Sequence, residues 1–138
     1  MASFNKFNAF AENLAEKVFD LGSDTLKVML TNTAPVAANS VKADLTEISA
    51  GNGYTAGGTA ATISSSEQTS GTYKLVLADV VFTATGAIGP FRYAVLYDDS
   101  AASDQLIGWW DYGSNITVNN GETFTVDFNA STGVLTLA

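Results

Sequence analysis

The chain has 138 residues, with six Lys and Arg against fourteen Asp and Glu, and it contains no His and no Cys. The lack of Cys excludes disulfides, thiolate nucleophiles and the usual structural zinc sites, and the lack of His excludes a Ser-His-Asp triad and the commonest metal ligand. A formal charge of −8 argues against a nucleic-acid partner, because phosphate binding needs clustered Lys and Arg. We therefore expect a protein that is not an enzyme, with no catalytic residues, no cofactor and no metal.

The remaining composition is that of one folded domain. The chain is 46% hydrophobic and only 14% charged, whereas an average domain carries about 25% charged residues. No apolar run approaches the roughly 18 residues of a membrane span, and the first residues lack the basic and apolar regions of a signal peptide. We expect a single domain over residues 1–138, made in the cytoplasm and without membrane contact. Its surface is built from small polar residues or is covered by partners.

Residues 3–21 carry the only helical pattern. At about 100° per residue, the apolar side chains of this segment fall within an arc of about 120°. These side chains are Phe4, Phe7, Phe10, Ala11, Leu14, Val18 and Leu21. Ser3 is placed as an N-cap, Gly22 is placed to end the helix, and Phe19 falls outside the arc. The seam is too short to favour a coiled coil, so we predict an amphipathic helix packed on the protein's own sheet.

After Gly22 the period changes to that of strands. Alternation predicts a half-buried strand at residues 26–31, and a long, loosely patterned connection follows over 36–72. Within it, the sequence indicates a short strand at 41–48 and β-branched residues at 59–66. Further strands are predicted at 73–84, 91–97, 105–110, 116–118, 123–128 and 134–137. Asn120-Gly121 predicts a hairpin. The fold class is therefore mainly β: a single antiparallel β-sandwich or barrel-like domain, with a β-rich body over 25–138 and one N-terminal helix.

Two polar clusters could form binding sites, but a structural role is favoured for each. The glycines at 51–58 lack the Lys and Ser/Thr ending of a phosphate-binding loop, and they indicate a flexible surface loop or one that orders against a neighbour. Asp98, Asp99, Asp104 and Asp111 could offer oxygen ligands to calcium, but their spacing differs from that of an EF-hand. We expect these residues to form turns. Nothing in the sequence selects an acid/base pair of carboxylates.

Trp109 and Trp110 are the most informative residues. Successive strand side chains point to opposite faces, so only one of them can enter a given core face. The other lies under the helix, against another subunit or in solvent. An interface or a second layer of core is favoured over a carbohydrate-stacking platform. Arg92 is the only Arg, and two readings stay open: a carboxylate partner at an interface, or a solvated edge residue.

Five phrases of the sequence resemble a family of tailed-bacteriophage structural proteins, and the likeness covers nearly the whole chain. They are SDTLKVMLT at 23–31, GNGYTAGG at 51–58, GPFRYAVLYDD at 89–99, LIGWWDYG at 106–113 and GETFTVDF at 121–128. The resemblance implies a virion component without catalytic residues, a head decoration (cement) protein. It also implies a homo-oligomer such as a trimer, with the major capsid protein or other virion proteins as partners and the virion as location.

A small β unit with few charges and apolar residues on many strand faces suits repeated assembly. Its candidate interface residues are Phe4, Phe7, Tyr54, Arg92, Trp109 and Trp110. The alternative from another class is a glycan-binding or host-attachment module of a tail or head fibre. An esterase or glycosidase that uses carboxylates alone comes last.

Overall fold

The computed structural model describes residues 2–138 and confirms a mainly β protein with antiparallel sheets and one α-helix. Its elements are β1 (Phe4–Lys6), α1 (Ala9–Ala15), β2 (Leu26–Thr31), a 3-10 turn η1 (Lys42–Asp44), β3 (Thr59–Ala61), β4 (Ile63–Thr69), β5 (Thr72–Leu77), β6 (Val80–Thr83), β7 (Ile88–Asp98), β8 (Leu106–Val118), β9 (Thr123–Val126) and β10 (Leu135–Leu137). In the described part of the chain, α1 is too short to cross a membrane.

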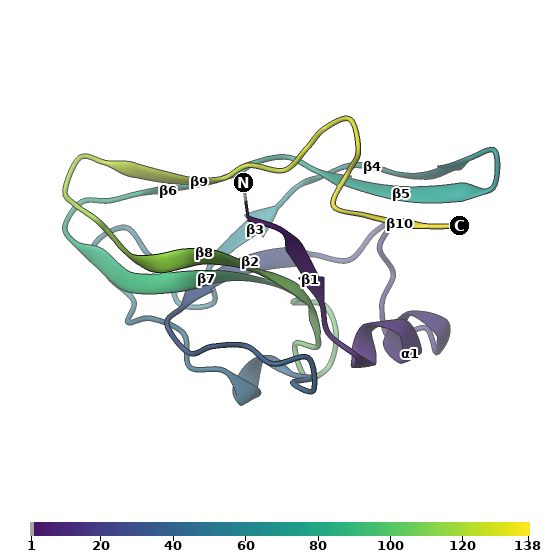
Figure 1. The fold of residues 1–138 in the computed structure, drawn as a ribbon, viewed down its shortest axis with the longest axis horizontal. Helices are drawn as coiled ribbons and strands as arrows, with labels where there is room; N and C mark the ends of the chain where they lie inside the picture. Colours follow the sequence, from purple (N-terminus) through teal and green to yellow (C-terminus); the bar gives the residue numbers. More distant parts are fainter. Residues whose placement is uncertain (1) are drawn as a thin grey trace.

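The strands form three separately hydrogen-bonded sheets, with the orders β1-β8-β7-β2-β3, β10-β5-β4 and β6-β9. The two smaller sheets lie over one face of the five-stranded sheet (Figure 1). The structure is thus more divided than the single sandwich or barrel expected from the sequence, and among residues 2–138 no sheet closes into a barrel. The division arises because the chain changes sheets between adjacent strands, as at the junction of β5 and β6.

The main core lies between the five-stranded sheet and the two smaller ones. Leu26, Val28 and Leu30 project from β2 into this space and are fully buried. Leu75 and Phe82 close it from β5 and β6. Each such side chain contributes about 2 kcal/mol by leaving water, so this layer supplies most of the apolar burial.

The opposite face of the five-stranded sheet is buried as well. Met29 and Val95 alternate with the residues of the main core and point to a second cluster, where Phe7, Leu45 and Tyr97 join them. Phe7 comes from the segment after β1, and Leu45 from the long connection that runs beneath β2 and β7 (Figure 1). The central strands are therefore apolar on both sides because both sides are covered.

The predicted helix over residues 3–21 is wrong for most of its length, because α1 covers only Ala9–Ala15. Residues 4–6 form β1 instead, with Phe4 opposite Trp110 on β8 and their ring centroids 5.3 Å apart. A helix would place Phe4 and Phe7 on one face. In the structure Phe4 packs against the main core and Phe7 is buried in the second cluster.

The helix also ends earlier than its apolar pattern predicts. Glu16 caps its C-terminus, and Lys17 has a left-handed backbone conformation with φ of 63°. Phe19 then turns back to stack on Phe10, with ring centroids 5.7 Å apart, and both rings are buried. This contact gives a role to Phe19, which did not fit the apolar face of the predicted helix. It also holds the segment after α1 in a non-helical conformation.

Four strand predictions need correction. The strand predicted over 73–84 is broken between β5 and β6, and those predicted at 105–110 and 116–118 are joined in β8. Residues 41–48 contain the turn η1 rather than a strand. The turn at Asn120-Gly121 forms, since the N–H of Glu122 donates to the carbonyl of Asn119 over 2.9 Å. The flanking strands β8 and β9, however, belong to different sheets, so the turn joins two layers and does not close a hairpin (Figure 1).

The glycine-rich loop over 51–58 is ordered by the protein's own body. The N–H of Gly57 donates to a carboxylate oxygen of Glu47 over 2.9 Å, and its carbonyl accepts from the hydroxyl of Tyr97. Gly58 has φ of +83° and lies so close to Val28 that a Cβ atom there would collide with the Val28 carbonyl. The loop is thus packed on β2 and is not the flexible surface loop expected from its composition.

The tight approach at Gly58 predicts a costly substitution. Gly71 has a similar φ of +87° but open space around it, so it serves as a matched control. We expect Gly71→Ala to lower the free energy of unfolding by about 1–2 kcal/mol, the cost of a left-handed residue with a Cβ. Gly58→Ala should lose at least about 2 kcal/mol more through the collision with β2. Urea denaturation measures both, and equal losses would contradict the packing described here.

Candidate functional site

The most distinctive surface feature is a cleft of about 490 Å³ between β8 and β9. We call it the β8–β9 cleft; its lining residues are Ala2, Trp110, Asp111, Tyr112, Gly113, Thr125, Val126 and Asp127. It combines aromatic side chains with two carboxylates, the residue types that recognise either a protein segment or a sugar.

The cleft exists because the strands on either side of it have no outer neighbour. β1 pairs with β8 only as far as Trp110, so the continuation of β8 has no backbone partner on that side among residues 2–138. β9 pairs with β6 alone in the same described range. The β8 and β9 edges lie on the same side of the two layers (Figure 1). Backbone donors and acceptors of both edges are therefore open beside the cleft.

Aromatic rings form the floor. Trp110 is only 8% exposed and packs against Phe128, with ring centroids 5.5 Å apart in an edge-to-face arrangement. Tyr112 is half-buried and meets Phe124 edge-to-face at 5.1 Å. Burial, assisted by the nearby charge of Asp127, raises the pKa of Tyr112 to about 12. At neutral pH the Tyr112 hydroxyl is therefore a hydrogen-bond donor at the floor of the cleft.

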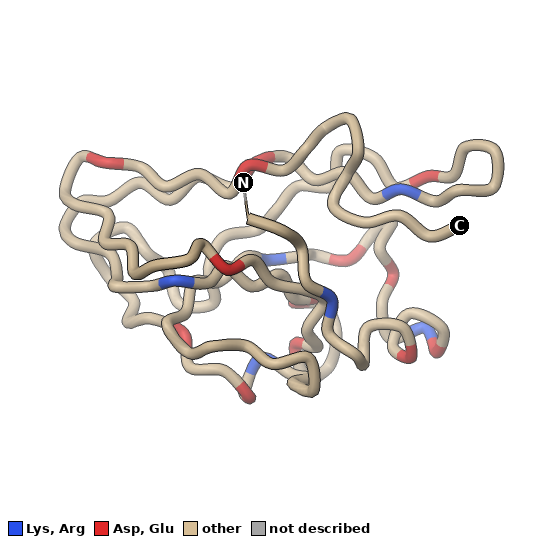
Figure 2. The backbone as a smooth tube through the Cα atoms, in the orientation of Figure 1, with Lys and Arg blue, Asp and Glu red and all other residues tan. Residues whose placement is uncertain are grey.

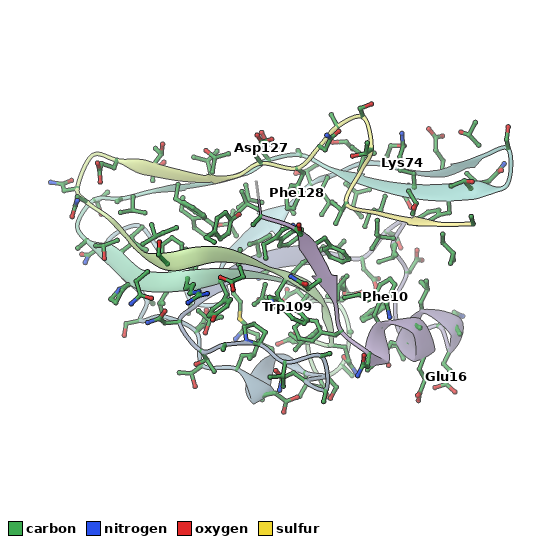
Figure 3. All side chains as sticks on the ribbon, in the orientation of Figure 1. Phe10, Glu16, Lys74, Trp109, Asp127 and Phe128 are labelled. Carbon is green, nitrogen blue, oxygen red and sulfur yellow. The ribbon has the colours of Figure 1, made fainter. Side chains whose placement is uncertain are left out.

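Carboxylates form the rim. The guanidinium of Arg92 donates two hydrogen bonds to Asp111, of 2.7 and 3.1 Å, and also lies over the ring of Tyr93. Arg92 lowers the pKa of Asp111, and the N–H of Gly113 lowers it further. Asp127 is exposed and points away from the layers, whereas the next residue, Phe128, lies between them (Figure 3).

The ion pair between Arg92 and Asp111 determines the sign of the charge around the cleft. Among residues 2–138, the charge of Arg92 is balanced by Asp111, and Asp127 is the lining residue whose charge has no ion-pair partner. Figure 2 shows acidic residues spread over both layers, with the cationic ones scattered among them. The cleft is therefore an aromatic surface in a negative environment.

The structure places the predicted interface residues in three locations. Phe4, Trp110 and Arg92 lie at or beside the β8–β9 cleft, with Arg92 joined to it through Asp111. Phe7 and Trp109 lie on the opposite face of the sheet, with ring centroids 4.6 Å apart. The position of Trp109 agrees with the second layer of core considered from the sequence, and Trp109 is seen beneath the sheet in Figure 3. The opposite orientation of the two Trp side chains is confirmed.

Tyr54 lies inside the molecule. Its hydroxyl donates to Glu47 over 2.8 Å and accepts the N–H of Leu30 over 3.1 Å. Burial raises the pKa of Tyr54 well above its usual range. Its contacts are those of a core residue that fixes the long connection to β2.

Two residues that give the cleft its aromatic and acidic character, Tyr112 and Asp127, were not singled out from the sequence. A signal exists for Tyr112, because it follows Trp110 by two positions on one strand and so shares its face. No local signal points to Asp127, which reaches the site only through the packing of the two layers.

Three of the four aspartates considered as calcium ligands have side chains engaged in contacts within the protein. Asp98 accepts the N–H groups of Ser100 and Ala101, so its expected turn-forming role is confirmed. Asp111 accepts the N–H of Gly113 but lies inside the continuous strand β8, so the turn expected there is wrong. Asp99 pairs with Lys27 at 3.2 Å. Among residues 2–138, no three acidic side chains lie close enough to hold a metal ion together.

A second cleft, of about 580 Å³, lies beside the 51–58 loop. It is lined mainly by small and uncharged polar residues. Its one carboxylate, Glu47, already accepts hydrogen bonds from Lys42, Tyr54 and Gly57. With no aromatic ring in its lining and its carboxylate engaged, this cleft offers less for recognition than the β8–β9 cleft.

Comparisons with protein family models, with curated proteins and with solved structures find no match to this chain.

The positions of the two Trp residues can be checked by fluorescence. We expect acrylamide to quench the Trp110→Phe variant, which keeps the partly exposed Trp109, more strongly than the Trp109→Phe variant, which keeps the buried Trp110. Both changes keep an aromatic ring in place, which limits the loss of packing. Stronger quenching of the protein that keeps Trp110 would show that the cleft is more open than described.

Proposed function

We propose that the protein is a non-enzymatic structural protein of a tailed-bacteriophage virion, a capsid decoration protein that bridges capsid subunits and stabilises the head. The observation that carries the proposal is the β8–β9 cleft, an aromatic floor between two strand edges whose backbone groups are open. An extended segment of a neighbouring subunit can pair with such an edge and place an apolar side chain in the cleft.

The negative surroundings favour a particular kind of partner. A capsid segment that carries Lys or Arg next to its apolar anchor would meet Asp127 at the rim, and complementary charge speeds and orients such an encounter. Each contact is modest in size. A decoration protein that engages several subunits gains strength through multivalency, because each further contact forms at a high effective concentration. The proposal also holds that the two layers form a single sandwich-like domain. It further holds that the protein is a homo-oligomer, with a trimer as the expected form.

Counting copies in purified particles tests the proposal most directly. Closed icosahedral symmetry repeats a head decoration protein on the order of hundreds of times, whereas a tail or fibre component occurs in a few to some tens of copies. Quantitative mass spectrometry of virions made from the genome that encodes this chain gives the number. A count of some tens or fewer would contradict head decoration.

The second candidate is a glycan-binding module of a tail or head fibre. The observation that favours it is the combination of an aromatic floor with the Asp111 and Asp127 carboxylates, which can accept hydrogen bonds from sugar hydroxyls. This candidate predicts saturable binding of host-surface glycans, with a Kd of about 1 mM, that changes the fluorescence of Trp110 in the Trp109→Phe variant. Head decoration predicts no such change.

A charge reversal at the cleft tests whether it contacts the capsid. Asp127→Lys changes an exposed residue of the lining, and Glu67→Lys makes the same change on β4, outside the cleft. We expect Asp127→Lys to weaken binding to heads assembled without this chain by about tenfold or more, because it removes the charge complementary to the partner. Glu67→Lys should bind as the unchanged protein does. Co-sedimentation with heads measures both, and equal binding by the two variants would exclude the cleft as the contact.

A further inference from the structure

The side chain of Asp98 is buried at the junction between β2 and β7, outside the lining of the β8–β9 cleft. Asp98 is the last residue of β7 and is 0% exposed, and its backbone lies opposite Leu26 at the start of β2. Its Oδ1 atom accepts the N–H groups of Ser100 and Ala101, at 2.9 and 3.2 Å. Its Oδ2 atom is buried and, among the described residues, meets no donor.

The segment that carries the next acid, Asp24, lies against the turn after Asp98, because Thr25 exchanges hydrogen bonds with Ser100 and Asp99. Asp24 lies just before β2 and forms a side-chain contact of hydrogen-bonding kind with Asp98, while its own Oδ2 atom accepts the N–H of Asp20 over 2.9 Å. Two ionised carboxylates can only accept, so this contact becomes a hydrogen bond when one of them carries a proton. Burial, together with the contact to Asp24, raises the pKa of Asp98 to about 7. The fully buried Asp98 is therefore the group that holds the proton.

No charged side chain near Asp24 and Asp98 supplies a cation that could replace the proton between them. Lys27, from β2, is directed to Asp99 at 3.2 Å. Asp20 accepts from Gly22 and Ser23 in its own turn, and Asp104 lies at the far end of the β7–β8 loop. No third carboxylate among residues 2–138 joins the pair to make a cation site. A single proton is thus what satisfies the two groups.

We propose that Asp24 and Asp98 form a proton-operated clasp, which fastens the segment before β2 to the turn after β7 and loosens as the solution becomes alkaline. Two backbone contacts lie beside the pair: the N–H of Thr25 donates to the hydroxyl of Ser100 over 2.8 Å, and the N–H of Asp99 donates to the carbonyl of Thr25 over 2.9 Å. With the proton lost, the carboxylates repel each other across this junction. The role is independent of the β8–β9 cleft.

The direction of the pH effect follows from proton linkage. An Asp in the unfolded chain has a pKa of about 3.9, and folding raises that of Asp98 to about 7. The folded protein therefore binds more protons than the unfolded chain between these values. The contribution of the protonated pair to the free energy of unfolding is therefore fully present below about pH 4. It decreases as the pH rises toward about 7 and then stays constant.

Thermal unfolding between pH 4.5 and 8.5 tests the clasp. We expect the Tm of the unchanged protein to fall by at least about 5 °C over this range. Asp98→Asn should remove most of the fall and raise the Tm at pH 8, because its amide donates to Asp24 at every pH while its oxygen keeps both backbone N–H groups. Asp99→Asn removes the same charge one residue away and should keep the slope. Asp24→Asn also supplies a permanent donor and replaces Asp98→Asn if that variant does not fold.

A site-resolved measurement separates the clasp from a general effect of charge. The side-chain carboxyl carbon of Asp98 should titrate near pH 7 by NMR in the unchanged protein. A titration below about pH 5, typical of an ordinary Asp, would overturn the proposal. So would a slope that persists in both Asn variants. Recovery of the low-pH Tm on adding calcium at pH 8 would also overturn it, by showing that the pair binds a cation.

Discussion

The structure depends on the burial of both faces of the five-stranded sheet along β2 and β7. Neighbouring residues of these strands, such as Val95 and Leu96, are fully buried on opposite sides, so each strand contributes to two cores. The smaller sheets would have no apolar surface to cover without the first face. The long connection after β2 would lose its anchor, Leu45, without the second. The tight approach of Gly58 to Val28 belongs to the same arrangement, because the chain must pass close to β2 to complete its cover.

The β8–β9 cleft marks the place where this double cover stops. Trp109 and Trp110 still serve the two cores in turn, but β8 then continues beyond the end of β1. From that point Tyr112 lies at a boundary between core and solvent, and β9 has no partner on its outer edge in the described part of the chain. An aromatic floor and open backbone groups thus come from one cause: the layers extend further than the strands that would close them.

Sequence patterns correctly predicted those features that depend only on the geometry of a single strand. The bounds of β2 and the opposite orientation of the two Trp side chains follow from alternation along a strand, which no distant contact can reverse without a bulge. The spacing of Phe4 and Phe7 fitted a helix face, yet it fits equally well a strand followed by a turn, and pairing with β8 at the other end of the chain decided between them. Asn120-Gly121 specified a turn but could not specify which sheet its strands join. Asp127 in the cleft and Asp24 beside Asp98 are brought to their sites by packing between distant segments, which no short-range pattern encodes.

The scarcity of cations explains how the carboxylates are arranged. With fourteen acids and six basic residues, most acids lack an ionic partner, and within residues 2–138 only three ion pairs form. Several of the other acids accept backbone N–H groups instead: Asp44 from Ser40 and Asp79 from Phe128. Asp98 accepts two backbone N–H groups and, in addition, holds a proton. These solutions stabilise individual carboxylates but leave the surface negative. A cationic group from solution therefore meets a surface on which few Lys or Arg side chains compete for the carboxylates.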